Sequence, residues 1–198
     1  GLRVFVGGNI GTPLSAFLAK KMPADYVVLE VSSFQLDTIC RFQPHLSIIL
    51  NISPDHLDRY SRYEDYVQSK LQIFQNQGPG SLLILNDDDR VLSAVAPPPG
   101  VRVMRYGRGP GRGRLAYKER GGIQANSGDG LWDRFSLERA HLRGRHNEEN
   151  LMAVVLAARA LGIPAEQIQR SIRSFPGLPH RLERVGETQG VAFYNDSK

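Results

Sequence analysis

The stretch "LSIILNISPDHLDRY", Leu46–Tyr60, decides the fold. Its first half is a near-continuous apolar run, which is typical of a buried strand in a sheet covered on both faces. Its second half places Asp55, His56 and Asp58 directly behind that strand. Open α/β sheets bind ligands at the carboxyl ends of their strands. The stretch therefore fits either a polar turn that caps a strand or the edge of an active site.

Similar apolar runs, "YVVLEV" at 26–31 and "SLLILND" at 81–87, alternate with amphipathic stretches in the first half of the chain. "PLSAFLAKKM" and "YEDYVQSKLQIFQNQ" have helical spacing, and Pro13 suits the first turn of a helix. This alternation predicts an α/β fold with a doubly wound, largely parallel sheet flanked by helices.

The pattern changes after "PPPG". Residues 102–138 hold short alternating segments between glycine-rich turns, which predict a small antiparallel β appendage. Helical patterns follow at 146–162 and 164–175, and a final hairpin at 181–196 is expected to return to a sheet edge. We interpret residues 1–198 as one domain that contains the 102–138 subregion. Both termini are expected to be cuts through a longer protein, because the chain starts inside a strand pattern.

The composition narrows the class of protein. Hydrophobic residues make up 41% of the chain, which excludes a disordered protein. The net charge of +5 suits nucleotides and also suits nucleic acid. The single cysteine, Cys40, excludes an internal disulfide framework and a cysteine-rich zinc site. No apolar run reaches the roughly 20 residues that span a bilayer, so we expect no membrane insertion. Nothing favours an obligate oligomer, and a monomer is expected.

Two strand ends carry groups that can bind a metal ion. Glu30 lies near the end of the 26–31 strand, and His56 follows the next strand. If both strands end at one side of the sheet, Glu30 and His56 converge. A carboxylate, an imidazole and water form a reasonable shell for Mg²⁺ or Mn²⁺. The alternatives are a glutamate that has reached solvent and a hydrogen-bonded structural histidine.

Other stretches are ambiguous by themselves. "GGNIGTP" offers backbone N–H groups beside a helix start, where anions bind. His146, Asn147 and Asn150 open a helix, but Asn147 could simply be its N-cap. Lys70 has no local feature that separates it from a solvated lysine. "GRGPGRGR" is similar to Arg/Gly segments that bind RNA, but it lacks interleaved aromatic residues, which favours a loop.

In order along the chain, several motifs together resemble the Mur ligases, the ATP-dependent amide-forming enzymes of peptidoglycan precursor synthesis. They are "GGNIGTP", "LEVSSFQL", "NISPDHLDRY", the Lys70 helix, "GRHNEENLMAV", "GLPHRLE" and "FYNDSK". "SSFQL", "LPHR" and "NDSK" resemble the branch that adds D-glutamate to UDP-N-acetylmuramoyl-L-alanine. Folylpolyglutamate synthases are the alternative within this chemistry. The resemblance implies a central domain with a mixed sheet and a bacterial, cytoplasmic enzyme.

The resemblance also implies roles. Glu30 and His56 match the ligands of the divalent cations, and Lys70 matches a lysine that is carbamylated and helps to hold the second Mg²⁺. Asn9 and Ser32 match positions that contact the muramoyl substrate. The positions that match the nucleotide-binding set are His146, Asn147, Asn150, Arg181, Asp196 and Lys198.

The implied reaction has two steps. ATP phosphorylates the terminal carboxylate of the substrate, and the amine of D-glutamate then attacks the acyl phosphate. The 198 residues contain no G-x-x-x-x-G-K-[ST] pattern, which this family carries for the β- and γ-phosphates. We therefore expect the isolated chain to be inactive. Two other hypotheses stay open: a basic nucleic-acid-binding module, and a nucleotide-binding scaffold without catalysis.

Overall fold

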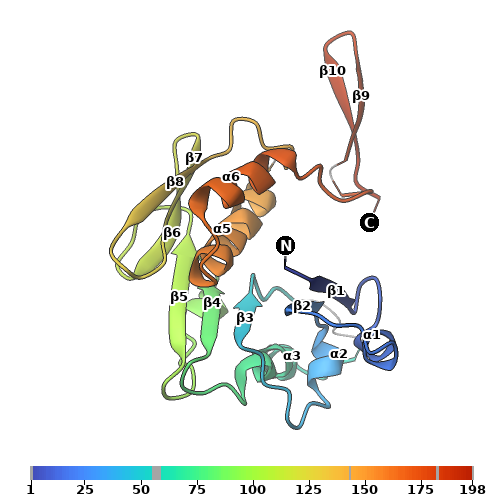
Figure 1. Cartoon of the computed structure of the whole chain (residues 1–198), viewed down its shortest axis with the longest axis vertical. Helices are drawn as coiled ribbons and strands as arrows, with labels where there is room; N and C mark the ends of the chain where they lie inside the picture. The colour runs from blue at the N-terminus through green and yellow to red at the C-terminus, as the bar shows by residue number, and fades with distance from the viewer. Residues whose placement is uncertain (1, 55–58, 143, 182, 198) are drawn as a thin grey trace. The chain divides into compact units, whose positions relative to one another are not determined.

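The computed structural model describes residues 2–54, 59–142, 144–181 and 183–197 (Figure 1). The chain forms two compact units. The first comprises Gly1–Pro44 and Ser53–Gln77, and the second comprises His45–Ile52 and Gly78–Lys198. Within the described ranges, no helix combines the length and apolar character that a bilayer crossing requires.

The first unit is built on a parallel pair of strands, β1 (Val4–Gly8) and β2 (Tyr26–Glu30), with Gly8 opposite Glu30. Its helices are α1 (Leu14–Ala19), α2 (Ser33–Leu36) and α3 (Tyr63–Leu71), and a 3₁₀ turn (Gln72–Phe74) extends α3. Since parallel strands end at the same edge of a sheet, the residues that follow β1 and β2 lie side by side.

Local sequence explains where these helices begin. Pro13 is the N-cap of α1, as its fixed φ allows. The α1 helix then packs on β1 through stacked rings of Phe5 and Phe17, with centroids 4.2 Å apart. Glu64 and Asp65 lie in the first turn of α3, where the helix dipole favours negative charge.

The second unit contains a six-stranded sheet in the order β3-β4-β5-β6-β7-β8. The strands are β3 (Leu46–Ile49), β4 (Leu82–Asn86), β5 (Arg102–Gly107), β6 (Arg114–Glu119), β7 (Gly122–Asn126) and β8 (Trp132–Ser136). Strands β3 to β6 pair in parallel, and β6 to β8 pair antiparallel.

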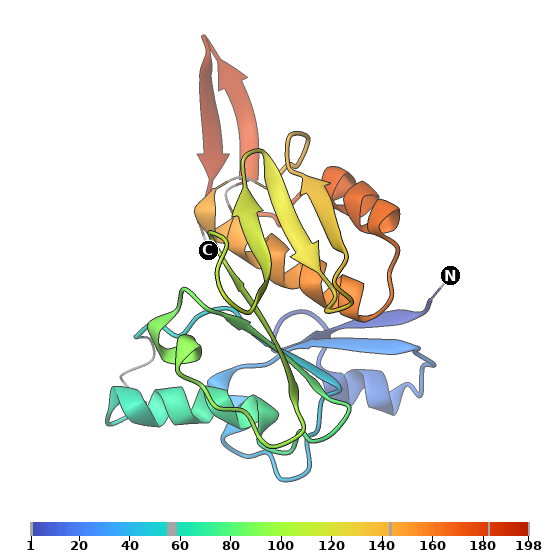
Figure 2. The same ribbon diagram turned by 90° about the vertical axis from the view of Figure 1, so that its left-hand side faces the viewer.

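Helices and a hairpin complete this unit. The helices are α4 (Arg90–Ser93), α5 (Arg145–Ala160) and α6 (Ala165–Ser174), and the hairpin is β9 (Glu183–Thr188) with β10 (Val191–Asn195). Figure 2 shows α5 and α6 on one side of the antiparallel strands. The core forms between the sheet and the apolar face of α5, and its fully buried members include Ile84, Met104, Tyr106, Met152, Val155 and Leu156.

The predicted α/β class with largely parallel pairing is confirmed, with three corrections. The 102–138 subregion is not wholly antiparallel, because its first strand, β5, pairs in parallel with β4 and β6. The α4 segment between β4 and β5 makes a crossover, and an alternating pattern does not reveal strand direction. The final hairpin forms, but β9 and β10 pair only with each other among the described strands. Finally, Asn147 is not an N-cap, since Gly144 holds that position.

Candidate active site

The loop after β1 folds against the end of β2. Asn9 N–H donates to the backbone oxygen of Glu30 at 2.8 Å, and Gly8 N–H donates to that of Thr12 at 3.0 Å. Gly8 has a φ of 113°, and a Cβ added there would lie 2.3 Å from the Glu30 oxygen. Only glycine tolerates both the dihedral angle and the close approach. The glycines of "GGNIGTP" therefore place Asn9 beside Glu30.

A pocket of about 250 Å³ opens at these strand ends. Gly8, Glu30 and Gln35 line it, together with the first turn of α1. Glu30 is exposed, and it makes no ion pair with any residue that the structure describes. The pocket thus presents a carboxylate and a polar loop at the carboxyl edge of a parallel sheet, as predicted for Glu30.

Ser32 has a structural task at the same place. It is the N-cap of α2 and forms a capping box with Gln35. Ser32 Oγ accepts from Gln35 N–H at 3.3 Å, and Ser32 N–H donates to Gln35 Oε1 at 3.0 Å. The capping box fixes the chain direction directly after Glu30. If the Ser32 hydroxyl contacts a substrate, it must do so while it also accepts the capping hydrogen bond.

Lys70 extends from α3, which is anchored to α2. Its Nζ lies 5.1 Å from the centroid of the Tyr66 ring, in cation–π geometry. The neighbouring Ser69 is buried and donates to the backbone oxygen of Ser33 at 2.8 Å. Ser69 Oγ also lies 3.1 Å from the hydroxyl of Tyr60. A hydroxyl network thus fixes the Lys70 helix against the segment that follows Glu30.

Sequence reasoning did not find this network, and "SK" in a helix gives no signal for it. His56, the other predicted metal ligand, lies outside the described residues, so the predicted convergence of Glu30 and His56 stays a prediction. Among the residues that are described, no cluster of three or more His, Cys, Asp or Glu side chains could hold a metal ion.

The predicted nucleotide-binding residues of α5 lie on its first two turns. His146 is exposed, while Asn147 and Asn150 are half-buried. Two acids between them are held by cations from the sheet side: Lys118 of β6 pairs with Glu148, and Arg108 Nη1 lies 3.6 Å from Glu149 Oε1. These pairs offset negative charge at the helix start.

The structure brings the "LPHR" and "NDS" motifs together. Asn195 Nδ2 lies 2.8 Å from His180 Nδ1, and His180 N–H donates to Glu183 Oε2 at 2.9 Å. Arg181 and Asp196 are exposed and immediately follow the two bonded residues. The hydrogen bond therefore holds their backbones near each other at the base of the β9–β10 hairpin. Lys198 lies outside the described residues.

The acidic run after β4 was not singled out from the sequence. Asp89 caps α4 by accepting from Val91 N–H at 2.9 Å and Leu92 N–H at 3.0 Å. Asp87 and Asp88 bind Arg114, with Nε at 2.9 Å from Asp87 Oδ2 and Nη2 at 2.7 Å from Asp88 Oδ1. The last arginine of "GRGPGRGR" is thus largely buried in an internal ion pair, which ties this loop to the end of β4.

Tyr106 lies below the same strand ends. Burial, assisted by the charges of Glu149, Asp89 and Asp88, strongly raises the pKa of its hydroxyl. The side chain is fully buried, and its hydroxyl donates to the Leu50 oxygen at 3.5 Å. Tyr106 therefore stays neutral beneath an edge that carries several carboxylates.

Comparison with known proteins identifies the family to which this chain belongs. Residues 6–158 match the Mur ligase middle domain. The chain belongs to the Mur ligase family. The UDP-N-acetylmuramoylalanine--D-glutamate ligase of Anaeromyxobacter dehalogenans is 42% identical over 99% of this chain and 44% of the relative. The protein of the same name from Geotalea uraniireducens is 39% identical over 100% of this chain and 44% of the relative. The chain thus spans less than half the length of these relatives.

Solved structures support the fold of this Mur ligase chain. The MurF ligase of Thermotoga maritima, solved in complex with ADP, has a TM-score of 0.71 and 19% identity, and the match covers 98% of this chain and 47% of that one. A pseudomurein peptide ligase type C from Methanothermus fervidus has a TM-score of 0.66 and 20% identity, over 94% and 46% of the two chains.

Proposed function

We propose that this chain is the central ATP-binding part of a ligase that joins D-glutamate to UDP-N-acetylmuramoyl-L-alanine. One observation carries the proposal: relatives named for that ligase align with 98–100% of the chain at 38–42% identity. Because the chain spans under half of their length, the reaction requires a longer protein. We expect the isolated chain to produce no turnover.

The first unit supplies the pocket for the carboxylate that is activated. Asn9 lies beside Glu30 through their backbone hydrogen bond, and Ser32 follows Glu30 by two residues in the sequence. We assign both Asn9 and Ser32 to contacts with the muramoyl substrate. The amide of Asn9 can donate to an acyl or sugar oxygen. Ser32 acts mainly by keeping Glu30 and α2 in register, because its hydroxyl already serves as an N-cap.

Glu30, His56 and Lys70 are assigned to Mg²⁺ or Mn²⁺ binding. Glu30 fits, since it is an exposed carboxylate at the pocket with no cationic partner among the described side chains. An ammonium at Lys70 does not fit, because a cation repels another cation. Carbamylation would convert Lys70 into an anionic oxygen donor, which suits a hard metal ion. A bound Mg²⁺ would neutralise phosphate oxygens during transfer.

The second unit supplies nucleotide contacts. We assign this role to His146, Asn147, Asn150, Arg181, Asp196 and Lys198. Asparagine amides can donate and accept, as a base edge requires, and an aspartate can accept from ribose hydroxyls. The pairing of Glu148 with Lys118 and of Glu149 with Arg108 removes negative charge that would repel a nucleotide anion.

The chemistry follows from these assignments. The substrate carboxylate attacks the γ-phosphorus of ATP, ADP leaves, and an acyl phosphate forms. The D-glutamate amine then attacks the acyl carbon, and inorganic phosphate leaves with the former C–O bond electrons. Placement of the reacting groups and stabilisation of phosphate charge supply most of the acceleration.

The other hypotheses are less well supported. A folylpolyglutamate-synthase-like substrate is the alternative within the enzyme class. A nucleic-acid-binding module is disfavoured because Arg114 of the "GRGPGRGR" loop is consumed by Asp87 and Asp88. We further propose a monomer that works in the bacterial cytoplasm and takes no nucleic acid.

The test is phosphate release by the full-length protein with ATP, Mg²⁺, UDP-N-acetylmuramoyl-L-alanine and D-glutamate. Lys70→Ala and Glu30→Gln should each lower kcat at least about a hundredfold while the fold persists. Lys20→Ala, an exposed lysine after α1, is the matched control and should change nothing. Turnover with a folate substrate in place of the muramoyl nucleotide would contradict the proposed specificity. A complete lack of turnover would contradict the ligase itself.

A further inference from the structure

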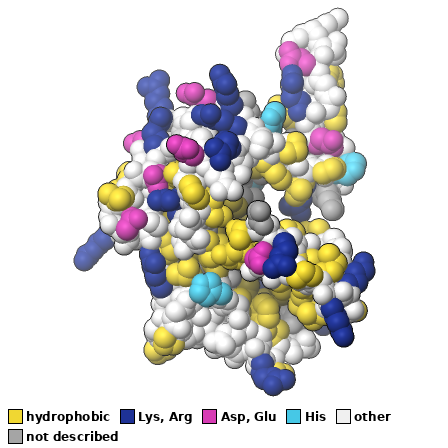
Figure 3. Space-filling view, viewed as in Figure 1, with side chains coloured by type: hydrophobic (Ala, Val, Ile, Leu, Met, Phe, Trp, Pro, Cys, Tyr) yellow, Lys and Arg dark blue, Asp and Glu magenta, His cyan; other side chains and the backbone are white. Residues whose placement is uncertain are grey.

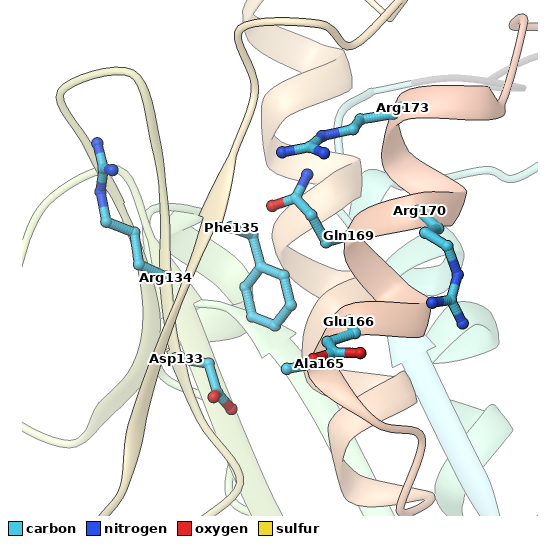
Figure 4. Close-up of a pocket in the computed structure, with 8 residues that line it drawn as sticks. All are labelled: Asp133, Arg134, Phe135, Ala165, Glu166, Gln169, Arg170 and Arg173. Carbon is cyan, nitrogen blue, oxygen red and sulfur yellow. The ribbon is translucent and has the colours of Figure 1, made fainter.

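A groove of about 360 Å³ lies between strand β8 and helix α6 (Figure 4). One wall is residues 133–135 of β8, and the other is the side of α6 that carries Glu166, Gln169 and Arg173. No role proposed above uses this groove. The strand β8 is the last in the order β3-β4-β5-β6-β7-β8, so one of its edges has no neighbour among the strands that the structure describes.

The backbone of Arg134 faces this open edge. Leu137 N–H donates to the Gly121 oxygen at 3.0 Å, which fixes the alternation of the antiparallel ladder. Every second residue of β8 then directs its backbone N–H and C=O towards β7, as Phe135 and Asp133 do. The backbone N–H and C=O of Arg134, which lies between them, point away from β7. No residue in the described part of the chain hydrogen-bonds these two Arg134 groups. An open pair of this kind is where an additional strand can bind.

Two residues further along β8, at Ser136, a side chain of α6 makes the backbone hydrogen bonds that an added strand would make. Ser136 N–H donates to Gln169 Oε1 at 2.7 Å, and Gln169 Nε2 donates to the Ser136 oxygen at 3.0 Å. One side-chain amide thus satisfies both backbone groups of Ser136. This pairing closes the end of the edge and leaves the next outward residue, Arg134, as the open position.

The groove is basic. Arg170 and Arg173 have no ion-pair partner among the described side chains, whereas Asp133 is occupied by Arg159, with Nε 2.7 Å from Oδ2. In Figure 4 the Arg173 side chain reaches from α6 towards β8 above Gln169, and the Arg134 side chain projects away from α6. The α6 wall therefore carries Arg173, which reaches towards β8, and Arg170, which lines the groove although its guanidinium lies on the far side of α6 in Figure 4. The one acid of this wall, Glu166, has no ion-pair partner among the described side chains.

We propose that this groove binds an acidic, extended peptide segment of a partner protein, which adds as a strand beside β8. Backbone bonds to Arg134 supply affinity, and carboxylates facing Arg170 and Arg173 supply selectivity. A second copy of the chain is a poor occupant. Antiparallel pairing centred on Arg134 would set Arg134 against its own copy and concentrate the α6 arginines at one interface.

The probe is a fluorescein-labelled peptide of about eight residues that alternates Glu and Val, titrated with purified protein and followed by anisotropy. Two control peptides have the same length: one has Lys in place of Glu, and the other carries N-methyl groups on alternate residues, so that its backbone cannot pair. Binding is expected for the acidic peptide alone, and it should weaken when salt rises to about 0.3 M.

Protein variants locate the site. Arg134→Pro removes both the arginine side chain and the outward backbone N–H. The matched control Arg134→Ala removes the side chain but keeps the backbone N–H. The proline variant should bind about tenfold more weakly than the alanine variant. The double variant Arg170→Glu/Arg173→Glu should lose about tenfold or more relative to wild type. Arg90→Glu/Arg41→Glu, at two exposed arginines outside the groove, is the charge-matched control and should leave binding unchanged.

Several results would overturn the proposal. Equal binding of the N-methylated peptide would remove the strand-addition mode, and this arm does not depend on any variant folding. Equal binding of the lysine peptide, or no effect of reversing Arg170 and Arg173, would remove the charge argument. Single-stranded DNA that binds wild type and is lost in the double variant would assign the groove to nucleic acid. A dimer that dissociates in Arg134→Pro would assign it to self-association.

Discussion

Strand β4 of the second unit and strand β2 of the first have similar apolar sequences, "LLILN" and "YVVLE", yet they are buried very differently. Leu83, Ile84 and Leu85 of β4 are 0% exposed, whereas Val27 and Val28 of β2 are 45% and 53% exposed. Figure 3 shows hydrophobic side chains at the surface over β1 and β2. The β4 strand has a neighbour on each side and α5 across one face, while β1 is the only partner of β2 among the described strands.

This difference shows that an apolar run indicates the capacity of a strand to be buried, and that its neighbours decide the outcome. Burial stabilises a protein by about 25 cal/mol for each Å² of apolar surface removed from water. The second unit therefore holds most of the hydrophobic stabilisation, and the first unit is expected to depend more on backbone fit and on hydrogen bonds. The predictions below test this contrast.

The largest effect is expected in the core of the second unit. Ile84→Ala should lower the free energy of unfolding by about 2–5 kcal/mol, because a buried cavity remains. Val28→Ala in β2 should lower it by less than about 1 kcal/mol. Ile84→Ala removes only one methylene more than Val28→Ala, and that methylene alone does not account for the expected difference between the two variants. Urea denaturation followed by circular dichroism measures both. Equal costs would mean that β2 is buried in solution.

The next effect is at the close approach of β1 to β2. Gly8→Ala should cost about 1–3 kcal/mol and disturb the Glu30 pocket, since its Cβ would lie 2.3 Å from the Glu30 oxygen. Gly11→Ala is the matched control: Gly11 also has a positive φ, of 74°, but beyond its chain neighbours no atom of the described residues would lie within 4 Å of the added Cβ. Thermal unfolding should rank Gly8→Ala as the more destabilising. The reverse order would contradict the packing of this loop.

Ion pairs should follow burial as well. Arg114→Ala should cost about 2 kcal/mol, because it leaves Asp87 and Asp88 without their forked partner. Arg62→Ala removes an exposed pair in the first unit. Although the Arg62 side chain lowers the pKa of Asp65, solvent screens the pair, and we expect no measurable change in stability. A similar loss in both variants would contradict this prediction.

The smallest effect near neutral pH concerns Tyr106, because it appears only in alkali. Its pKa is raised by burial in the folded chain, while the unfolded chain ionises near about 10. Its contribution to stability is therefore fully present below about pH 10 and falls by about 1.4 kcal/mol per pH unit above it. Tyr106→Phe should show a shallower alkaline loss than wild type in urea titrations between about pH 9 and 12. Parallel profiles would mean that this hydroxyl ionises freely when folded.

Much of the site could be anticipated from the sequence because strand ends and glycine turns are local features. Glu30 and the "GGNIGTP" loop lie where the pattern places them, at one edge of a parallel pair. The position of Lys70 could not be anticipated, because the side chains that fix its helix, Ser69 and Tyr60, are joined across the fold. The ion pairs of Arg114 could not be predicted for the same reason, since Asp87 and Asp88 lie 27 and 26 residues from Arg114 in the sequence.

The sequence by itself determined the α/β class, the existence of most helices and strands, and the family, because periodicity and ordered motifs are properties of the chain. Only the tertiary structure decided the parallel direction of β5, the separate pairing of the β9–β10 hairpin and the exposure of the β2 valines. It also decided that "GRGPGRGR" closes onto aspartates instead of facing solvent as a free basic loop. Each of these depends on which distant residues become neighbours, and that is set by the free energy of the whole packed arrangement, not by any local pattern.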